Sequence, residues 1–230
     1  MNILALDTCT ESCSAALLYQ GQIFERIEMT QRGHSDLILA MMDELFKQAE
    51  STIADVDAVA FGRGPGSFTG VRVGVGVAQG IAFARDIPVI PVSTLAAVAQ
   101  GVVDEFDNEH IAVAMDARMG EIYGANYQVV DGLVTLLDEE QVCPPETFKP
   151  ISEQSWLGIG TGWAEYEAIL SENYSGQLSQ LEANRFPQAG NIIKLAQVEV
   201  EAGRLLPADQ ALPVYLRNNV AKKKGEQRGK

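Results

Sequence analysis

The order of hydrophobic and polar residues predicts alternating strands and helices. Apolar runs of about four to eight residues are typical of buried strands, and longer runs repeating every three to four residues are typical of helices. Strands are predicted over 3–6, 14–19, 22–29, 55–61, 89–92, 111–115, 121–129, 133–137 and 156–160, and helices over 34–50, 71–84, 94–101, from about 164, and 189–202. Segment 138–150 is predicted to be a loop and 213–217 an extended segment. This order predicts an α/β fold.

One series of elements occurs twice along the chain. An apolar strand ends in Asp7, and a turn, a second strand, a glycine turn at Gly21 and a third strand follow. The same series runs from Asp116 to the turn at Gly132. An internal repeat predicts two related halves. We expect them to span residues 1–107 and 108–216, followed by a flexible basic tail over 217–230.

The predicted helix over 71–84 has almost no polar face, since only Arg72 and Gln79 are polar. A helix that is apolar on all sides is buried on more than one side. It follows a glycine-rich loop, Gly64–Gly70, in which Ser67 or Thr69 provides an N-cap. Four glycines from 70 to 80 each cost about 1 kcal/mol relative to alanine, which close packing would offset. One side is therefore assigned to the chain's own sheet and the other to a second protein chain.

Charge argues against a protein that binds nucleic acid alone. The net charge is −14, and residues 217–230 hold six basic residues against one acidic, so the body carries −19. An acidic body repels phosphate backbones. Three cysteines without zinc-site spacing predict neither a disulfide framework nor a structural metal. The first residues carry no basic leader, so we expect a cytoplasmic protein with no membrane association.

Three turns are candidates for nucleotide binding. The elements are Asp7-Thr8-x-Thr10, Asp116 and Gly158-x-Gly160-x-Gly162. Their order resembles the actin, sugar-kinase and heat-shock-protein-70 superfamily, in which paired Asp-bearing hairpins flank the phosphates and a glycine turn packs on adenosine. Taken singly, an Asp after a strand is also an ordinary turn residue.

Other catalytic classes find little support in the sequence. Loop Gly64–Gly70 has no Gly-Lys-Ser/Thr, so it is not a Walker A loop. Its backbone could hold an anion before a helix, or it could be a tight turn that lets the helix pack. His34 and His110 are far apart, which argues against a zinc hydrolase, and no Gly-x-Ser-x-Gly motif is present.

Four strings of residues together resemble the TsaB (YeaZ) family. They are Ile3-Leu4-Ala5-Leu6-Asp7-Thr8, Gly64-Pro65-Gly66-Ser67-Phe68-Thr69-Gly70-Val71-Arg72, Met115-Asp116-Ala117-Arg118-Met119-Gly120-Glu121-Ile122-Tyr123 and Pro213-Val214-Tyr215-Leu216-Arg217. The resemblance runs through the chain up to the basic tail. Cys9 stands where the family often has serine, which is tolerable if no phosphate binds there.

The resemblance implies an actin-like (ASKHA, ribonuclease-H-like) duplicated fold of two mixed-sheet halves with flanking helices. It also implies a role in making threonylcarbamoyladenosine next to the anticodon of tRNAs that read codons starting with A. The chain would be the non-catalytic partner of TsaD, which transfers the threonylcarbamoyl group that TsaC activates. It would form a ternary complex with TsaE, pair with itself when TsaD is absent, and meet tRNA only through the complex.

The resemblance further implies pairing through the first two long helices. The interface residues chosen from helical geometry are Leu37, Met41, Leu45, Val71, Gly74, Val75 and Ala78. Val75→Glu is then expected to abolish pairing and leave the fold intact. No catalytic residue, metal or cofactor is assigned, and Asp7, Thr8, Thr10, Asp116 and Gly160 remain as candidates for weak nucleotide binding. The alternative is an ATPase or kinase of the actin-like superfamily that acts by itself.

Overall fold

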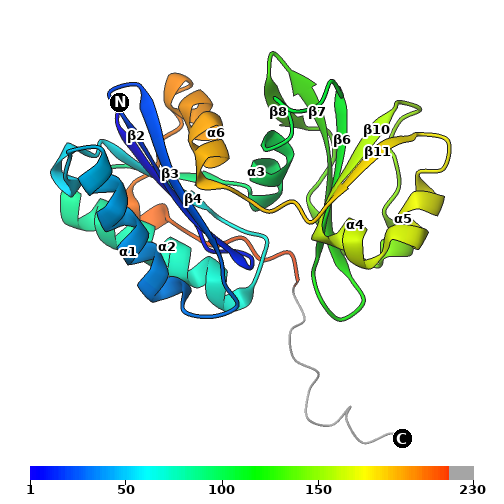
Figure 1. Cartoon of the computed structure of the whole chain (residues 1–230), viewed down its shortest axis with the longest axis horizontal. Helices are drawn as coiled ribbons and strands as arrows, with labels where there is room; N and C mark the ends of the chain where they lie inside the picture. The colour runs from blue at the N-terminus through cyan, green and yellow to red at the C-terminus, as the bar shows by residue number, and fades with distance from the viewer. Residues whose placement is uncertain (218–230) are drawn as a thin grey trace, which may run out of the picture.

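The chain forms two halves, each built on one twisted sheet (Figure 1). The computed structural model describes residues 1–217, so the predicted tail lies outside the described residues except for Arg217. The first sheet has the strand order β3-β2-β1-β4-β5, and the second has the order β11-β10-β6-β7-β8, with β9 paired to β7. Their bounds are β1 Ile3–Asp7, β2 Ser12–Tyr19, β3 Gln22–Met29, β4 Ala58–Gly62, β5 Val89–Val92, β6 His110–Asp116, β7 Ile122–Val130, β8 Leu133–Leu136, β9 Gln141–Cys143, β10 Trp156–Gly160 and β11 Leu178–Ala183.

The two sheets share one topology. In the first, β1 pairs antiparallel with β2 and parallel with β4, while β2 pairs antiparallel with β3 and β4 parallel with β5. In the second, β6 has the same relations to β7 and β10, while β8 and β11 stand in the places of β3 and β5. This duplication confirms the predicted actin-like fold of two mixed-sheet halves.

Helices cover both faces of each sheet. Figure 1 shows α1 and α2 on the face of the first sheet turned away from the second half, α4 and α5 on the second half, and α3 and α6 between the halves. Their bounds are α1 His34–Gln48, α2 Phe68–Arg85, α3 Thr94–Gln100, α4 Thr161–Glu165, α5 Glu167–Asn173 and α6 Ala189–Glu201, with 3-10 turns η1 Ile53–Asp55, η2 Pro145–Thr147 and η3 Ala208–Gln210.

Two helices pack on the sheet of the other half. All strands of the first sheet lie within 1–107 and those of the second within 108–216. Helix α3, which follows the first sheet in the chain, packs its Leu95 and Val98 among residues of the second sheet. Helix α6, which follows the second sheet, packs Ile192 and Ile193 on the first. The division after residue 107 therefore separates the strands of the two sheets but not their helices. As a domain boundary it stays a prediction.

Strand β1 is buried on both faces because of this layering. Leu4 and Leu6 point into the core beneath α1 and α2, whereas Ile3 and Ala5 point towards α6. Side chains alternate between the two faces of a strand, so a strand that is buried on both faces is a continuous apolar run. Within residues 1–217, no helix combines the length and the apolar character needed to cross a membrane.

The largest differences from the predictions lie in two segments. The segment expected to be a loop over 138–150 contains β9 and η2, because Cys143 pairs with Ile122 in register with β7. Strand β11 was not predicted. Its sequence, Leu-Ser-Gln-Leu-Glu-Ala, lies at the edge of the sheet and is only partly buried, so it lacks the apolar run that marks an inner strand.

Candidate functional site

The glycine loop before α2 is shaped by contact with the turn that follows β1. The backbone N–H of Ser67 donates to the carbonyl oxygen of Cys9 at 2.7 Å, and a Cβ at Gly66 would overlap that oxygen. A Cβ at Gly70 would likewise overlap the carbonyl oxygen of Thr8. Of the two predicted caps, Ser67 is the N-cap of α2. Its hydroxyl accepts a hydrogen bond from the N–H of Gly70 at 3.4 Å. These glycines are therefore explained by packing.

The structure places the expected interface row of α2 against the chain's own core. Val71, Gly74, Val75 and Ala78 are all buried, and a Cβ at Gly74 would lie 2.8 Å from the Thr8 hydroxyl. On α1, Met41 and Leu45 are buried in the same core and Leu37 packs against it. A partner would have to meet other side chains of these helices. Val75→Glu would put a charge into the core, so it cannot leave the fold intact as expected.

The opposite side of α2 is apolar and open. At Gly76 and Gly80 a Cβ would have no neighbour within 4 Å among the described residues. Phe83 on the same side is 82% exposed, whereas Val73 and Val77 are half-buried and pack partly against the core. On neighbouring α1, Leu39 is 52% exposed. We call Val73, Gly76, Val77, Gly80 and Phe83 the outer face of α2.

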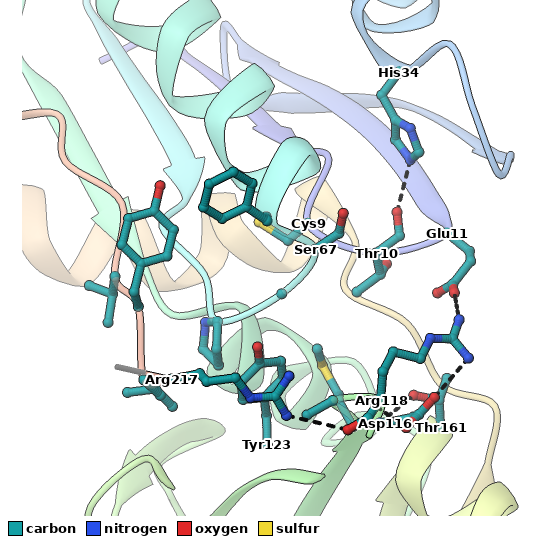
Figure 2. Close-up of a pocket in the computed structure, with 18 of the residues that line it drawn as sticks. Cys9, Thr10, Glu11, His34, Ser67, Asp116, Arg118, Tyr123, Thr161 and Arg217 are labelled. Atoms are coloured by element: carbon teal, nitrogen blue, oxygen red, sulfur yellow. Dashed lines mark hydrogen bonds and ion pairs between the residues drawn. The ribbon is translucent and has the colours of Figure 1, made fainter. Parts of the chain in front are cut away.

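A cavity of about 390 Å³ lies between the two halves (Figure 2). The first half contributes the turn after β1, the start of α1 and the glycine loop, and the second contributes the turn after β6 and the start of α4. The C-terminal segment 214–217 closes one side. The lining residues include Cys9, Thr10, Glu11, His34, Ser67, Phe68, Asp116, Arg118, Tyr123, Thr161, Tyr215 and Arg217.

The two cations of the cavity are paired with the chain's own carboxylates. Arg118 contacts Asp116 at 2.8 Å within its half and Glu11 at 2.7 Å across the cavity. Arg217 contacts Glu121 at 2.5 Å. Figure 2 shows the guanidinium group of Arg118 between Glu11 and Asp116. An incoming anion would have to displace a carboxylate from either arginine, so the geometry is a poor match for a polyphosphate.

The predicted nucleotide residues are only partly brought together. Thr10 and Asp116 line the cavity. Asp7 and Thr8 are buried instead, and the Thr8 hydroxyl donates to the carbonyl oxygen of Gly70 at 2.6 Å. A Cβ at Gly160 would lie 2.5 Å from the carbonyl oxygen of Ala114, so this glycine lets α4 approach β6.

Comparison with known proteins covers almost the whole chain. The protein from Haemophilus influenzae named tRNA threonylcarbamoyladenosine biosynthesis protein TsaB is 43% identical over 97% of both chains. The protein of the same name from Escherichia coli is 39% identical over 97% of this chain and 98% of its own.

The chain belongs to the TsaB (YeaZ) family. A family model described as TsaD, tRNA N6-adenosine threonylcarbamoyltransferase, also matches residues 25–225. The solved structure titled YeaZ from Pseudomonas aeruginosa is 42% identical, with a TM-score of 0.87 over 94% of this chain and 99% of that one. The resemblance inferred from the four strings is confirmed.

Sequence reasoning missed several residues of the cavity in this TsaB-family chain. His34 was considered as a zinc ligand and not as part of a cavity, and its ring nitrogen Nε2 lies 2.8 Å from the carbonyl oxygen of Thr10. Arg118, Tyr123, Tyr215 and Arg217 were noted only as members of the family strings. The signal was present, because three of the four strings supply residues that line this cavity.

Asp7 lies outside the cavity in an environment that disfavours its charge. Burial raises the pKa of its carboxyl from 3.8 to about 6, although the N–H of Cys9 donates to Oδ1 at 2.9 Å. Gly62 leaves room for this carboxylate, since a Cβ there would overlap Oδ2. The TsaB-family fold therefore holds this acid as a buried turn residue rather than as an open ligand.

The raised pKa predicts how Asp7 affects stability as pH changes. The unfolded chain ionises Asp7 near pH 4 and the folded chain near pH 6, so the cost of burying its charge is absent below pH 4 and applies in full above pH 6. The pKa difference corresponds to roughly 3 kcal/mol. We expect Asp7→Asn to gain stability relative to the unmodified chain as pH rises from 4 to 7. Urea unfolding at several pH values measures this, and a constant difference between the two proteins would contradict it.

Proposed function

We propose that the chain is a non-catalytic subunit of the machinery that makes threonylcarbamoyladenosine in tRNA. Membership of the TsaB family across 97% of the chain is the observation that carries this proposal. The names of the relatives supply the pathway, and the match to the TsaD family model supports a common ancestry with the transferase. A cytoplasmic location and the absence of a resident cofactor or metal belong to the same proposal.

The outer face of α2 supports pairing with another chain as the means of action. Glycine inside a helix costs about 1 kcal/mol relative to alanine. Gly70 and Gly74 are required by the chain's own packing, but Gly76 and Gly80 meet nothing inside the described chain. Small residues on an outer helix face let a second helix approach closely. The exposed Phe83 gives this face an apolar group that a partner would bury.

The partner that we propose for this face is TsaD, and a second copy of the chain would occupy it when TsaD is absent. TsaD is the natural partner because its family model matches this chain, so both would present related helices. TsaE would join the pair in a ternary complex. The acidic body supports contact with tRNA only through the complex.

The alternative function is an ATPase or kinase that acts by itself. It is favoured by one observation, namely that Thr10 and Asp116 face each other across a cavity large enough for a small ligand. It is disfavoured by the burial of Asp7 and by the carboxylates that occupy both arginines of the cavity. We therefore favour the non-catalytic subunit.

Reconstitution of the pathway tests the proposal. TsaC, TsaD and TsaE are incubated with unmodified tRNA, threonine, bicarbonate and ATP, with and without this chain. We expect threonylcarbamoyladenosine, measured by mass spectrometry of digested tRNA, to form at least about tenfold faster when the chain is present, because TsaD then has its partner. An equal rate in both reactions would contradict the proposal.

A second outcome separates the two functions. ATP turnover by the isolated chain that disappears in the Asp116→Asn variant would identify an enzyme acting through the cavity. The matched control is Asp209→Asn, which removes one carboxylate from an exposed 3-10 turn outside this cavity.

A further inference from the structure

Three of the family strings meet at one side of the cavity. They are the glycine loop Gly64–Gly70, the turn Ala117–Glu121 and the C-terminal segment Pro213–Arg217, which are far apart in the sequence. The proposed pairing through the outer face of α2 uses none of them directly. Their contacts with one another follow a single path from the first half to the second.

The C-terminal segment is first attached to the glycine loop. The N–H of Val214 donates to the carbonyl oxygen of Arg63 at 2.7 Å. Gly64 has a φ of +96°, and a Cβ there would lie 2.8 Å from the carbonyl oxygen of Val214. Only glycine combines this conformation with such a close approach. The segment and the loop are therefore shaped to fit each other.

The next contact is with the first turns of α2. The rings of Tyr215 and Phe68 lie 6.0 Å apart between centroids. The guanidinium carbon of Arg72 lies 3.3 Å from the centroid of the Phe68 ring and 5.0 Å from that of Tyr215. A cation over aromatic faces is attracted by their quadrupoles. Tyr215 is thus held to the same helix that carries the outer face.

The segment ends on the second half, at Arg217. Its guanidinium donates to Glu121 at 2.5 Å and to the carbonyl oxygen of Arg118 at 3.3 Å, and lies 3.6 Å from the sulfur of Met119. Figure 2 shows the side chain of Arg217 reaching the turn that carries Arg118.

The turn that receives Arg217 has an unfavourable backbone. Arg118 and Met119 have φ of +60° and +61°, which residues with a Cβ rarely adopt, and Gly120 follows at +78°. Such a conformation persists only where its surroundings hold it. Within the turn, the N–H of Ala117 donates to the carbonyl oxygen of Glu121 at 3.0 Å. The side-chain contacts that add to this are Arg118 with Asp116 and Glu11, and Arg217 with Glu121. Losing the Arg217 contact would therefore loosen the turn.

We propose that Pro213–Arg217 is a strap that couples the start of α2 to the turn Ala117–Glu121 across the cavity. The strap transmits a displacement at either end to the other, because Tyr215 is fixed to α2 and Arg217 to the turn within three residues of chain. It also forms one wall of the cavity, so its release opens that wall. The coupling lies within the free chain. A partner that binds α2 would change the cavity through this coupling. That consequence rests on the proposed function.

Hydrogen–deuterium exchange of the free chain tests the coupling without any partner. The variant is Arg217→Ala. Its control is Arg204→Ala, which breaks a more exposed arginine–glutamate ion pair, that with Glu199, outside the strap. We expect Arg217→Ala to speed exchange at least about tenfold in peptides covering 115–123 and also in those covering 64–72. Arg204→Ala should change neither.

The opposite end of the strap supplies the second variant. Tyr215→Ala removes the ring that contacts α2 and leaves Arg217 in place, and Tyr215→Phe keeps the ring. We expect Tyr215→Ala, but not Tyr215→Phe, to speed exchange in the turn over 115–123. Faster exchange confined to the mutated end in both alanine variants would overturn the proposal. A uniform increase throughout the chain would also overturn it, because the segment would then act only on global stability.

Discussion

Replacing Gly80 by glutamate is expected to abolish pairing with TsaD and with a second copy of the chain while the isolated chain stays folded. Gly80 is exposed on the outer face of α2, and a side chain there meets nothing inside the described chain. Glutamate is a better helix former than glycine by roughly 0.5–1 kcal/mol. In a close helix–helix contact its charge would be buried without a partner, which costs several kcal/mol. An affinity loss of at least about 100-fold follows from that cost.

Two measurements check the Gly80→Glu variant. Light scattering coupled to size exclusion reports the homodimer, and co-purification with tagged TsaD reports the heterodimer. Ala168→Glu is the matched control, since it adds the same charge at an exposed helical position of the other half. Pairing of Gly80→Glu at the level of Ala168→Glu would remove the outer face of α2 from the interface.

Replacing Gly70 by alanine is expected to destabilise the chain by at least about 3 kcal/mol, the upper part of the range for overpacking. A Cβ at this position overlaps the carbonyl oxygen of Thr8, which is backbone and part of a buried turn, so it cannot move aside cheaply. Gly76→Ala on the same helix should have the opposite effect. Its Cβ points into open space, so the gain in helix propensity stabilises the isolated chain by up to about 1 kcal/mol.

Urea unfolding of the isolated chain, monitored by circular dichroism, measures the stability of both alanine variants. Both substitutions add one methyl group to the same helix, so each is the control for the other. Equal midpoints for Gly70→Ala and Gly76→Ala would show that the contact with Thr8 is not the reason for glycine at position 70.

The fold could be predicted from the sequence because apolar runs mark the strands and show that their order repeats. Asp7 and Asp116 end equivalent strands, and the turns at Gly21 and Gly132 follow at similar spacing. Both glycines have positive φ, as the turns require. The N-cap at Ser67 was also predictable, because a serine after a glycine-rich loop begins the apolar run.

The residues of α2 do not show which of its sides packs on the sheet. A helix that is apolar on every side has no periodic signal to show which side meets the sheet. Small residues spaced by four form two rows along this helix, one that contains Gly74 and one that contains Gly76 and Gly80. The row with Gly74 is the inner one, because Thr8 and Leu6 lie against it. The row with Gly76 and Gly80 is the outer one. Contacts with β1, its turn and the rest of the core distinguish the two rows, and these contacts are long-range.

The cavity was predictable only in part for a similar reason. Thr10 follows β1 and Asp116 ends the equivalent strand β6, so their meeting follows from the repeat. Arg217 reaches Glu121 across 96 residues, and no local pattern connects the two. The burial of Asp7 could not be predicted either, because it depends on the space that Gly62 in the neighbouring strand leaves for its carboxylate.

The packing of α6 on the first sheet has a consequence for synthesis of the chain. The ribosome releases the strands of the first sheet early, and domains generally fold from the N-terminus as they emerge. The face of that sheet with Ile3 and Ala5 stays uncovered until Ala189–Glu201 has been made. For most of translation the nascent chain therefore displays an apolar surface. The step that covers this surface, and with it the final folding of the first half, cannot occur before α6 has left the ribosome.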